Sequence, residues 1–122
     1  MEKENFTEFG VREGDIVAKG KRFTIEKDGK EIARAHLYIM HNNLHKRPFG
    51  LMEDVYVDEE FRGQGIGTKL VKRLVEVAEE EDCYKLIATS RYERPRVHEL
   101  YEELAFDNHG IEFRMNFSGD EE

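Results

Sequence analysis

Hydrophobic and polar positions alternate through the first half of the chain, which is the period of a strand with one buried face. Phe23 and Ile25, for example, are separated and followed by polar residues. Asp28-Gly29 stands between two alternating segments and suits a type I′ hairpin turn, because that turn needs positive φ at both central residues. The pattern predicts a hairpin and a third strand, over residues 16–26, 32–40 and 49–57.

The second half of the chain changes to the period of a helix. An apolar stripe from Leu70 to Ala78 predicts a helix over 68–82. A short apolar run predicts a strand over 84–90, and Pro95 suits the first turn of a second helix, where its missing N–H costs nothing. Alternation returns in a last predicted strand, over 111–117, with Ile111, Phe113, Met115 and Phe117 on its buried face.

This order of elements, ββ-β-α-β-α-β, predicts an α/β fold in which helices pack on a mixed sheet. The length of 122 residues fits one domain with its own apolar core, so we expect a single domain over 1–122. Residues 1–14 are mostly polar, and we expect them to form a weakly ordered lead-in.

Charge and cysteine content narrow the classes of partner. Lysine and arginine total 19 and aspartate and glutamate total 27, which gives a net charge of −8 at pH 7. An acidic chain disfavours nucleic acid as a partner but is compatible with a cationic substrate. No apolar run reaches the ~20 residues that cross a bilayer, and the charged opening at Met1 does not resemble a signal peptide. With Cys83 as its single cysteine, we expect a cytoplasmic protein that has no membrane partner.

The segment between the third strand and the first helix follows neither the strand period nor the helix period of apolar positions. It contains Gly63, Gly65 and Gly67. Glycine lets the backbone approach a ligand closely, and a helix N-terminus offers free N–H groups to an anion. The spacing G-x-G-x-G fits neither the dinucleotide-binding fingerprint G-x-G-x-x-G nor the phosphate loop that ends in Gly-Lys-Ser/Thr. The residues alone leave two interpretations open: a glycine turn that caps the helix, or a cradle for a phosphate group.

Two motifs in the same order resemble the GCN5-related N-acetyltransferase (GNAT) superfamily. Its signature, Arg/Gln-x-x-Gly-x-Gly/Ala between a strand and a helix, is met by Arg62, Gly65 and Gly67. Residues 101–106, Tyr-Glu-Glu-Leu-Ala-Phe, are similar to the Tyr-x-x-x-Gly-Phe end of a later helix in the family. The resemblance covers about residues 20–117 and implies the acyl-CoA N-acyltransferase fold.

The resemblance also implies that acetyl-CoA binds, as the acetyl donor, to the strand-loop-helix unit over 49–82. Exposed backbone groups of Val55 and Val57 would pair with the pantetheine arm. The pyrophosphate would lie on the amide groups of the loop, at Arg62, Gly63, Gln64, Gly65, Ile66, Gly67 and Thr68.

By the same resemblance, Glu53 matches the base that takes a proton from the acceptor amine. Tyr101, in the strand-helix-strand unit over 83–117, matches the acid that protonates the sulfur of coenzyme A. Each has a structural alternative: Glu53 as a solvated or ion-paired strand carboxylate, and Tyr101 as a core aromatic. The roles of Arg94 and His98 stay open, and no residue is assigned to a metal.

The chain departs from the family pattern at two places. Ala105 stands where the family has Gly, which costs ~1 kcal/mol if the helix ends there in the left-handed conformation. Only about 20 residues precede Phe23, fewer than the strand and two helices that wall the acceptor site in the family. We therefore expect a truncated N-terminal region, with an acceptor site that is open or is completed by a partner chain, as in a homodimer.

These observations support one leading hypothesis and two rivals. The leading hypothesis is direct transfer of an acetyl group from acetyl-CoA to a primary amine, in a ternary complex. A non-catalytic acyl-CoA-binding or regulatory domain is the alternative, because the acceptor half is short. An interaction protein whose glycine loop is only a helix cap would bind no coenzyme A.

Overall fold

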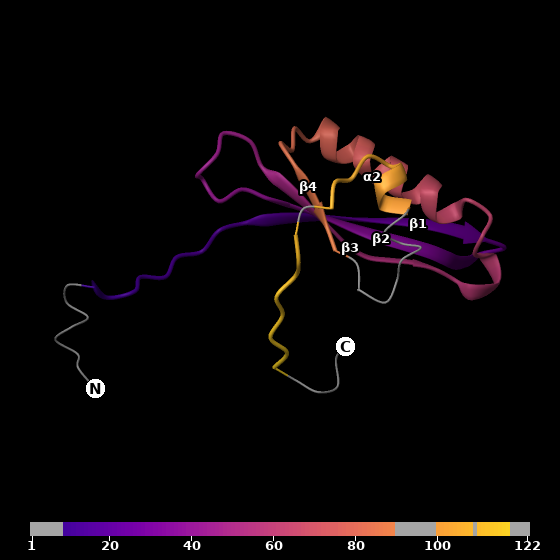
Figure 1. The fold of residues 1–122 in the computed structure, drawn as a ribbon, viewed down its shortest axis with the longest axis horizontal. Coiled ribbons are helices and arrows are strands. Elements are labelled where there is room, and N and C mark those ends of the chain that lie inside the picture. The colour runs from indigo at the N-terminus through magenta and orange to yellow at the C-terminus, as the bar shows by residue number, and fades with distance from the viewer. Residues whose placement is uncertain (1–8, 90–99, 109, 118–122) are drawn as a thin grey trace.

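The computed structural model describes residues 9–89, 100–108 and 110–117, which form a sheet with helices on one face. The strands lie in the order β1-β2-β3-β4, with β1–β2 and β2–β3 antiparallel and β3–β4 parallel. Helix α2 crosses the sheet diagonally (Figure 1). The elements are β1 (Ala18–Lys27), β2 (Lys30–Met40), β3 (Phe49–Val57), the 3₁₀ helix η1 (Glu59–Phe61), α2 (Ile66–Glu80) and β4 (Leu86–Ala88).

The predicted hairpin is confirmed. Its turn places Asp28 at φ 53° and Gly29 at φ 78°, the two positive values that a type I′ turn needs. The third strand has the predicted bounds, 49–57, whereas α2 begins at Ile66 rather than at 68. The helix begins earlier because Gly65, at φ 81°, already provides its left-handed N-cap residue.

The core lies between α2 and the central strands. Every member of the predicted helical stripe is buried, and the small side chains of Ala33 and Ala35 on β2 let the helix approach the sheet closely. Leu74 is fully buried, so its replacement by alanine would cost about 2–5 kcal/mol. The buried cluster consists of Ala33, Ala35, Leu37, Ile39, Met52, Leu70, Val71, Leu74, Val77 and Ala78.

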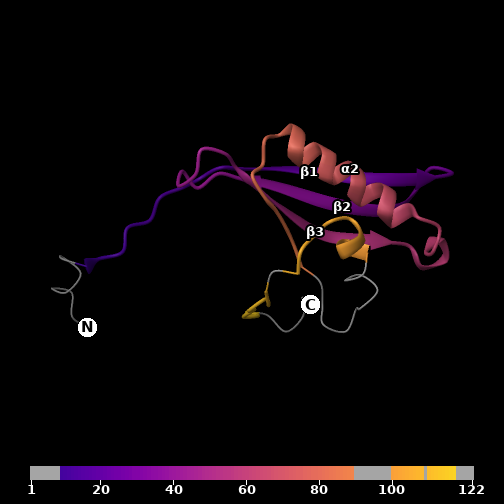
Figure 2. The same cartoon turned by 45° about the horizontal axis from the view of Figure 1, so that its top comes forward.

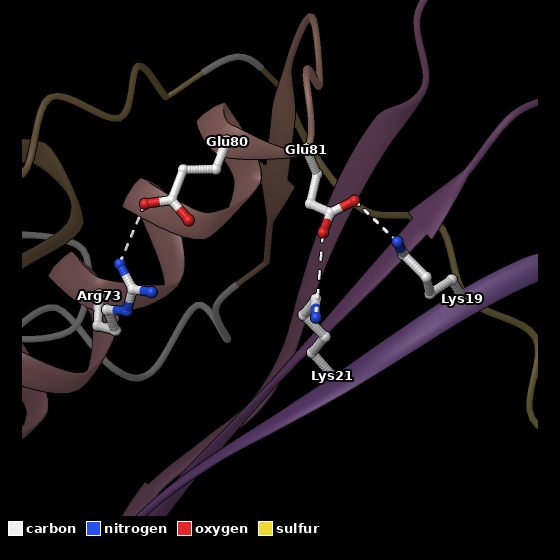
Figure 3. Close-up of polar contacts among 5 residues, drawn as sticks. All are labelled: Lys19, Lys21, Arg73, Glu80 and Glu81. Atoms are coloured by element: carbon white, nitrogen blue, oxygen red, sulfur yellow. Dashed lines mark hydrogen bonds and ion pairs between the residues drawn. The ribbon is translucent and has the colours of Figure 1, made fainter.

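Charged side chains connect the end of α2 to the edge strand β1 (Figure 3). Glu81, just after the helix, accepts a hydrogen bond from Lys19 Nζ at 2.8 Å and has Lys21 Nζ at 3.9 Å. The hydrogen bond from Lys19 lowers the pKa of Glu81. Along the helix, Arg73 pairs with Glu80 at 3.3 Å. These pairs are exposed and therefore contribute modestly to stability.

The helical turn at 100–103 lies on the same side of the sheet as α2 (Figures 1 and 2), and Tyr101 and Leu104 pack against the core cluster. On the opposite face, which we call the open face, Tyr38, Tyr56 and Ile87 remain more than a third exposed. Within the described residues, no helix combines the length and apolar character needed to span a membrane.

The prediction of a last strand over 111–117 is wrong for this structure. In the part of the chain that the structure describes, these residues pair with no strand of the sheet, and they run away from it on the side opposite α2 (Figure 1). Alternation predicts which side chains share a face, but the pairing partner is set by tertiary contacts. The predicted strand over 84–90 is reduced to β4, while the start of the second helix and most of the lead-in lie outside the described residues.

Candidate functional site

Strands β3 and β4 pair along only part of their length. Gly50–Met52 pair with Leu86–Ala88, and beyond Met52 the structure shows no partner on that side of β3 among the described residues. The Asp58 N–H donates to the Ile32 carbonyl at 2.8 Å, on the β2 side. Because peptide groups alternate along a strand, those of Val55 and Val57 point toward the opened β4 side. The predicted backbone contacts thus lie where the two strands diverge.

A β-bulge sits at the middle of β3. His36 pairs with Glu53 and Arg34 with Tyr56, so Ala35 alone faces the two residues between them. One of these, Asp54, has φ 51°, a left-handed conformation that Asp tolerates better than most residues. Since His36 and Arg34 share a face of β2, the bulge places Glu53 and Tyr56 together on the open face.

The glycine loop leaves backbone donors free at the start of α2. Gly63 and Gly65 both have φ 81°, and an added Cβ at either would meet nothing within 4 Å, so conformation rather than space requires glycine there. Among the described residues no side-chain hydrogen bond caps the helix, and the N–H that bonds to the N-cap carbonyl is that of Lys69. The amides of Ile66, Gly67 and Thr68 therefore remain available to an anion.

Arg62 is fixed at the junction of strand and loop. Its Nε donates to the Val57 carbonyl at 2.7 Å, and its guanidinium carbon lies 5.4 Å from the centre of the Tyr56 ring. Arg34 contacts the same ring at 4.6 Å. The Val57 carbonyl is thus already occupied, which leaves its N–H as the group that could pair with a ligand. Two guanidinium groups at the Tyr56 ring offset the acidic surroundings locally.

Glu53 holds its proton more tightly than an ordinary glutamate. Partial burial is the largest cause of the raised pKa, followed by the negative charges of Asp54 and Glu112, while Arg114 and His36 act in the opposite direction. A raised pKa brings a carboxylate closer to the range in which a general base works near neutral pH. His36, directly across on β2, has a buried Nδ1 without a hydrogen-bond partner in the described structure.

The ring of Tyr101 belongs to the apolar packing at the edge of the core. It lies 5.4 Å from the centre of the Phe106 ring, and its carbonyl accepts a hydrogen bond from the Phe106 N–H at 2.9 Å. Ala105 between them has φ 72°, the left-handed helix end where the family has Gly. The packing agrees with the core alternative for the ring, and it is compatible with a hydroxyl that reaches a ligand. Arg94 and His98 lie outside the described residues.

Sequence reasoning missed the open-face neighbours of the predicted residues. His36, Arg34 and Tyr56 come next to Glu53 or Arg62 only through strand pairing. An available signal was Asp54, a poor strand former in the middle of a predicted strand, which indicates a bulge.

Comparisons with known proteins agree with this arrangement. The Acetyltransferase (GNAT) family matches residues 2–106. A glucosamine 6-phosphate N-acetyltransferase of Trypanosoma brucei brucei is 36% identical over 70 residues, which are 57% of this chain and 46% of that protein. A thialysine N-epsilon-acetyltransferase of Bos taurus is 42% identical over 53 residues, 43% of this chain and 31% of that protein. These matched segments span less than half the length of either curated relative.

Solved structures show the same fold. The crystal structure of glucosamine-6-phosphate N-acetyltransferase from Arabidopsis thaliana is similar, with a TM-score of 0.70 and 31% identity over 78% of this chain and 65% of that one. The mixed sheet with helices on one face thus matches the fold of acetyltransferases of known structure. The chain belongs to the acetyltransferase (GNAT) family.

Proposed function

We propose that this protein is an N-acetyltransferase that moves an acetyl group from acetyl-CoA directly to a primary amine in a ternary complex. The observation that carries the proposal is the divergence of β3 from β4 beyond Met52, which opens toward the uncapped start of α2. It exposes backbone hydrogen-bonding groups next to an anion-binding helix terminus, and these two features suit the pantetheine arm and the pyrophosphate of one ligand.

The residues present fit the donor. Val55 and the Val57 N–H would hold the pantetheine arm, while the loop amides and Arg62 would hold the pyrophosphate against the net charge of −8. When bound, acetyl-CoA supplies a thioester whose acyl carbon accepts the attacking amine. The pyrophosphate contacts fall to Arg62, Gly63, Gln64, Gly65, Ile66, Gly67 and Thr68.

The side chains around the bulge would manage the protons and the developing charge. Glu53 takes a proton from the attacking amine, directly or through a water, and its raised pKa suits that task. The Val55 N–H polarises the carbonyl oxygen, and Tyr101 donates its hydroxyl proton to the departing sulfur. Cys83 has a pKa raised by burial and by Glu81 and Asp82, so its thiol stays protonated, which favours direct transfer over an acyl-cysteine route.

We infer an acceptor that combines a primary amine with an anionic group. The named substrates of the relatives, glucosamine 6-phosphate and thialysine, join an amine to a phosphate and to a carboxylate respectively. On the open face, the guanidinium of Arg34 lies over the ring of Tyr56, and Tyr56 follows Glu53 by three residues on β3. Arg34 therefore offers a positive charge to the anionic group of such an acceptor. A protein with one partly buried thiol also suits the reducing cytoplasm as its compartment.

The proposal is tested by titration calorimetry with coenzyme A, together with an acetylation screen over amino sugars, amino sugar phosphates and amino acids. We expect coenzyme A to bind and at least one amine to be acetylated. Gly65→Ala should weaken binding, because alanine resists φ 81° and would distort the loop, whereas Gly14→Ala, outside the site, should bind normally.

Each alternative has its own signature in these measurements. Tight binding of coenzyme A without any acetylated product would favour a regulatory acyl-CoA-binding domain. Absence of binding would favour a glycine loop that only caps the helix. If Tyr101→Phe turned over as fast as the wild type, the acid role of Tyr101 would be wrong.

A further inference from the structure

A cavity of about 330 Å³ lies beside the loop that joins β2 to β3, and we call it the loop cavity. Its lining residues are His45, Lys46, Arg47 and Tyr84. Three of them come from the loop itself, and Tyr84 comes from the segment just before β4. All four side chains can donate a hydrogen bond, and two of them are permanently cationic near neutral pH. The lining therefore suits an anion.

The loop cavity lies in a part of the chain that is poor in carboxylates. Between Glu31 and Glu53 the sequence contains no aspartate or glutamate, although the whole chain contains 27. Asp82, which follows α2, lies 3.5 Å from Arg47, but its side chain is 71% exposed, so this ion pair is weak and easily opened. The local charge is thus positive within a chain of net charge −8.

Hydrogen bonds within the loop hold the cationic side chains in place. The Nδ1 of His41 accepts from the Asn43 N–H at 3.3 Å, and its Nε2 lies 3.3 Å from the Lys46 carbonyl, to which it is placed to donate. The Leu44 N–H donates to the Asn42 side chain at 3.1 Å. The backbone at Lys46 is therefore fixed by the loop itself, before any ligand binds.

The remaining wall is fixed by contacts between the loop and the start of β4. The Tyr84 N–H donates to the Pro48 carbonyl at 2.9 Å, and the centre of the Tyr84 ring lies 4.7 Å from that of His45. Lys85 Nζ, 5.3 Å from the centre of the same ring, adds a further positive charge beside the lining. Since both walls are already ordered, a ligand would lose little free energy in ordering them.

We propose that the loop cavity binds the phosphate group of a small phosphorylated molecule. A phosphate has oxygens directed to several sides, so it can accept hydrogen bonds from Lys46, Arg47 and His45 together, whereas a carboxylate presents two oxygens in one plane. A phospholipid headgroup carries the same chemistry, but an anionic membrane would repel a chain of net charge −8. A small phosphorylated molecule is therefore the favoured ligand.

The loop cavity is separate from the proposed site for acetyl-CoA. The β2–β3 loop and the start of α2 lie at opposite ends of the sheet (Figures 1 and 2). Near the cavity, β3 and β4 are joined by the hydrogen bond from the Gly50 N–H to the Lys85 carbonyl, at 2.9 Å, and they diverge only beyond Met52. Both ligands can therefore be bound at once, and the phosphate would add contacts where the two strands are joined.

Nuclear magnetic resonance on the ¹⁵N-labelled full chain locates the site. Inorganic phosphate and glucose 6-phosphate, which has no amine to acetylate, are each titrated with coenzyme A present in excess, so that the glycine loop is already occupied. We expect the amide signals of residues 45–47 and 84–85 to shift along one saturating curve for glucose 6-phosphate, and sodium chloride at equal ionic strength to leave them unchanged. Absence of a shift, or a shift that does not saturate, would overturn the proposal.

Charge-neutral variants show whether the cavity or the overall charge attracts the ligand. Lys46→Gln and Arg47→Gln should each weaken glucose 6-phosphate binding at least ~5-fold, because each removes a charged donor. Both side chains are exposed, so the variants should fold normally, which circular dichroism checks. Lys72→Gln removes the same charge from an exposed position on α2 and should leave the affinity unchanged. An equal loss of affinity in Lys72→Gln would contradict a defined site.

Asp82→Asn should act in the opposite direction. Asparagine tolerates the left-handed φ of 65° at this position, so the turn should persist while Arg47 loses its competing carboxylate. Binding of glucose 6-phosphate should then become at least ~2-fold tighter, and an unchanged or weaker affinity would mean that Arg47 does not contact the ligand.

Vesicles distinguish the two sources of the phosphate group. The chain should not sediment with phosphatidylcholine vesicles that contain phosphatidic acid. Sedimentation that is lost in Lys46→Gln would assign the cavity to a lipid headgroup and would overturn the choice of a small molecule. If coenzyme A itself fails to bind, the same titrations without it still test the loop cavity, so this proposal and the proposed acetyl transfer fail separately.

Discussion

At the scale of single residues, the candidate site depends on a strained position next to a partly buried carboxylate. Asp54 adopts φ 51° within β3, and this bulge turns Glu53 and Tyr56 to the same face. The charge of Asp54 raises the pKa of Glu53 in addition to the effect of burial. Conformation and protonation of the proposed base are therefore set by the same neighbour.

Asp54→Asn should separate the two effects. Asparagine also tolerates the left-handed region, so the bulge should persist while the neighbouring negative charge is lost. The pKa of Glu53 should then fall, and the acidic limb of kcat/KM against pH should shift to lower pH. Asp54→Val, which resists this φ, should instead lower stability by about 1–2 kcal/mol. An acidic limb that stays in place in Asp54→Asn would argue against Glu53 as the base.

Glu53→Gln should show that the ionised carboxylate of Glu53 lowers the stability of the fold at neutral pH. The folded-state pKa of Glu53 is raised, so its stabilising contribution is present below the unfolded pKa and is lost as pH rises through the folded pKa. At pH 7, Glu53→Gln should therefore melt at a higher temperature than the wild type and should lose turnover. The difference in Tm should shrink toward pH ~4.3, where glutamate itself becomes neutral. Glu79→Gln, at an exposed position of α2, is the control. An equal gain in Tm in this control would show that the gain in Glu53→Gln does not come from the raised pKa of Glu53.

At the scale of elements, the fold is stabilised by helix α2, which packs on the sheet. The two ends of this helix are stabilised in different ways. Helix α2 begins on a glycine with positive φ and ends where Glu81 meets lysines of β1 (Figure 3). The helical turn at 100–103 ends on Ala105 at φ 72°, where a side chain is unfavourable. The second helix is therefore the less well terminated of the two.

Ala105→Gly should stabilise the protein by about 1 kcal/mol, because glycine adopts this conformation without the steric cost of a Cβ. The measurement is the midpoint of urea unfolding at constant m. Ala78→Gly, inside α2, is the matched change and should destabilise by ~1 kcal/mol or more. A lower midpoint in Ala105→Gly would show that the helix end is not strained.

At the scale of the whole molecule, the described residues form a sheet with one covered face and one open face. The covered face carries the core, and the open face carries Glu53, His36 and Tyr56, whose ring contacts two arginines. The loop that would hold an anion lies at one end of β3, and the exposed segment 111–117 carries Glu112 and Arg114, whose charges act in opposite directions on the pKa of Glu53.

Local features of this protein were determined by the sequence alone. Three such features depend on residues near one another in the chain: the turn at Asp28-Gly29, the bounds of β3 and the buried stripe of α2. Steric preference and the period of apolar positions act over a few residues, so a local pattern suffices to predict them. The family motif around Arg62 is local for the same reason.

Only the tertiary structure decided how these pieces meet. Three features depend on neighbouring strands: the two residues of β3 that face Ala35, the end of β3–β4 pairing after Met52, and the position of His36 across from Glu53. The alternation over 111–117 predicted a strand, yet among the described residues the segment pairs with no strand of the sheet. A side-chain pattern shows which face of a strand favours burial, whereas the surface that buries it is set by long-range packing.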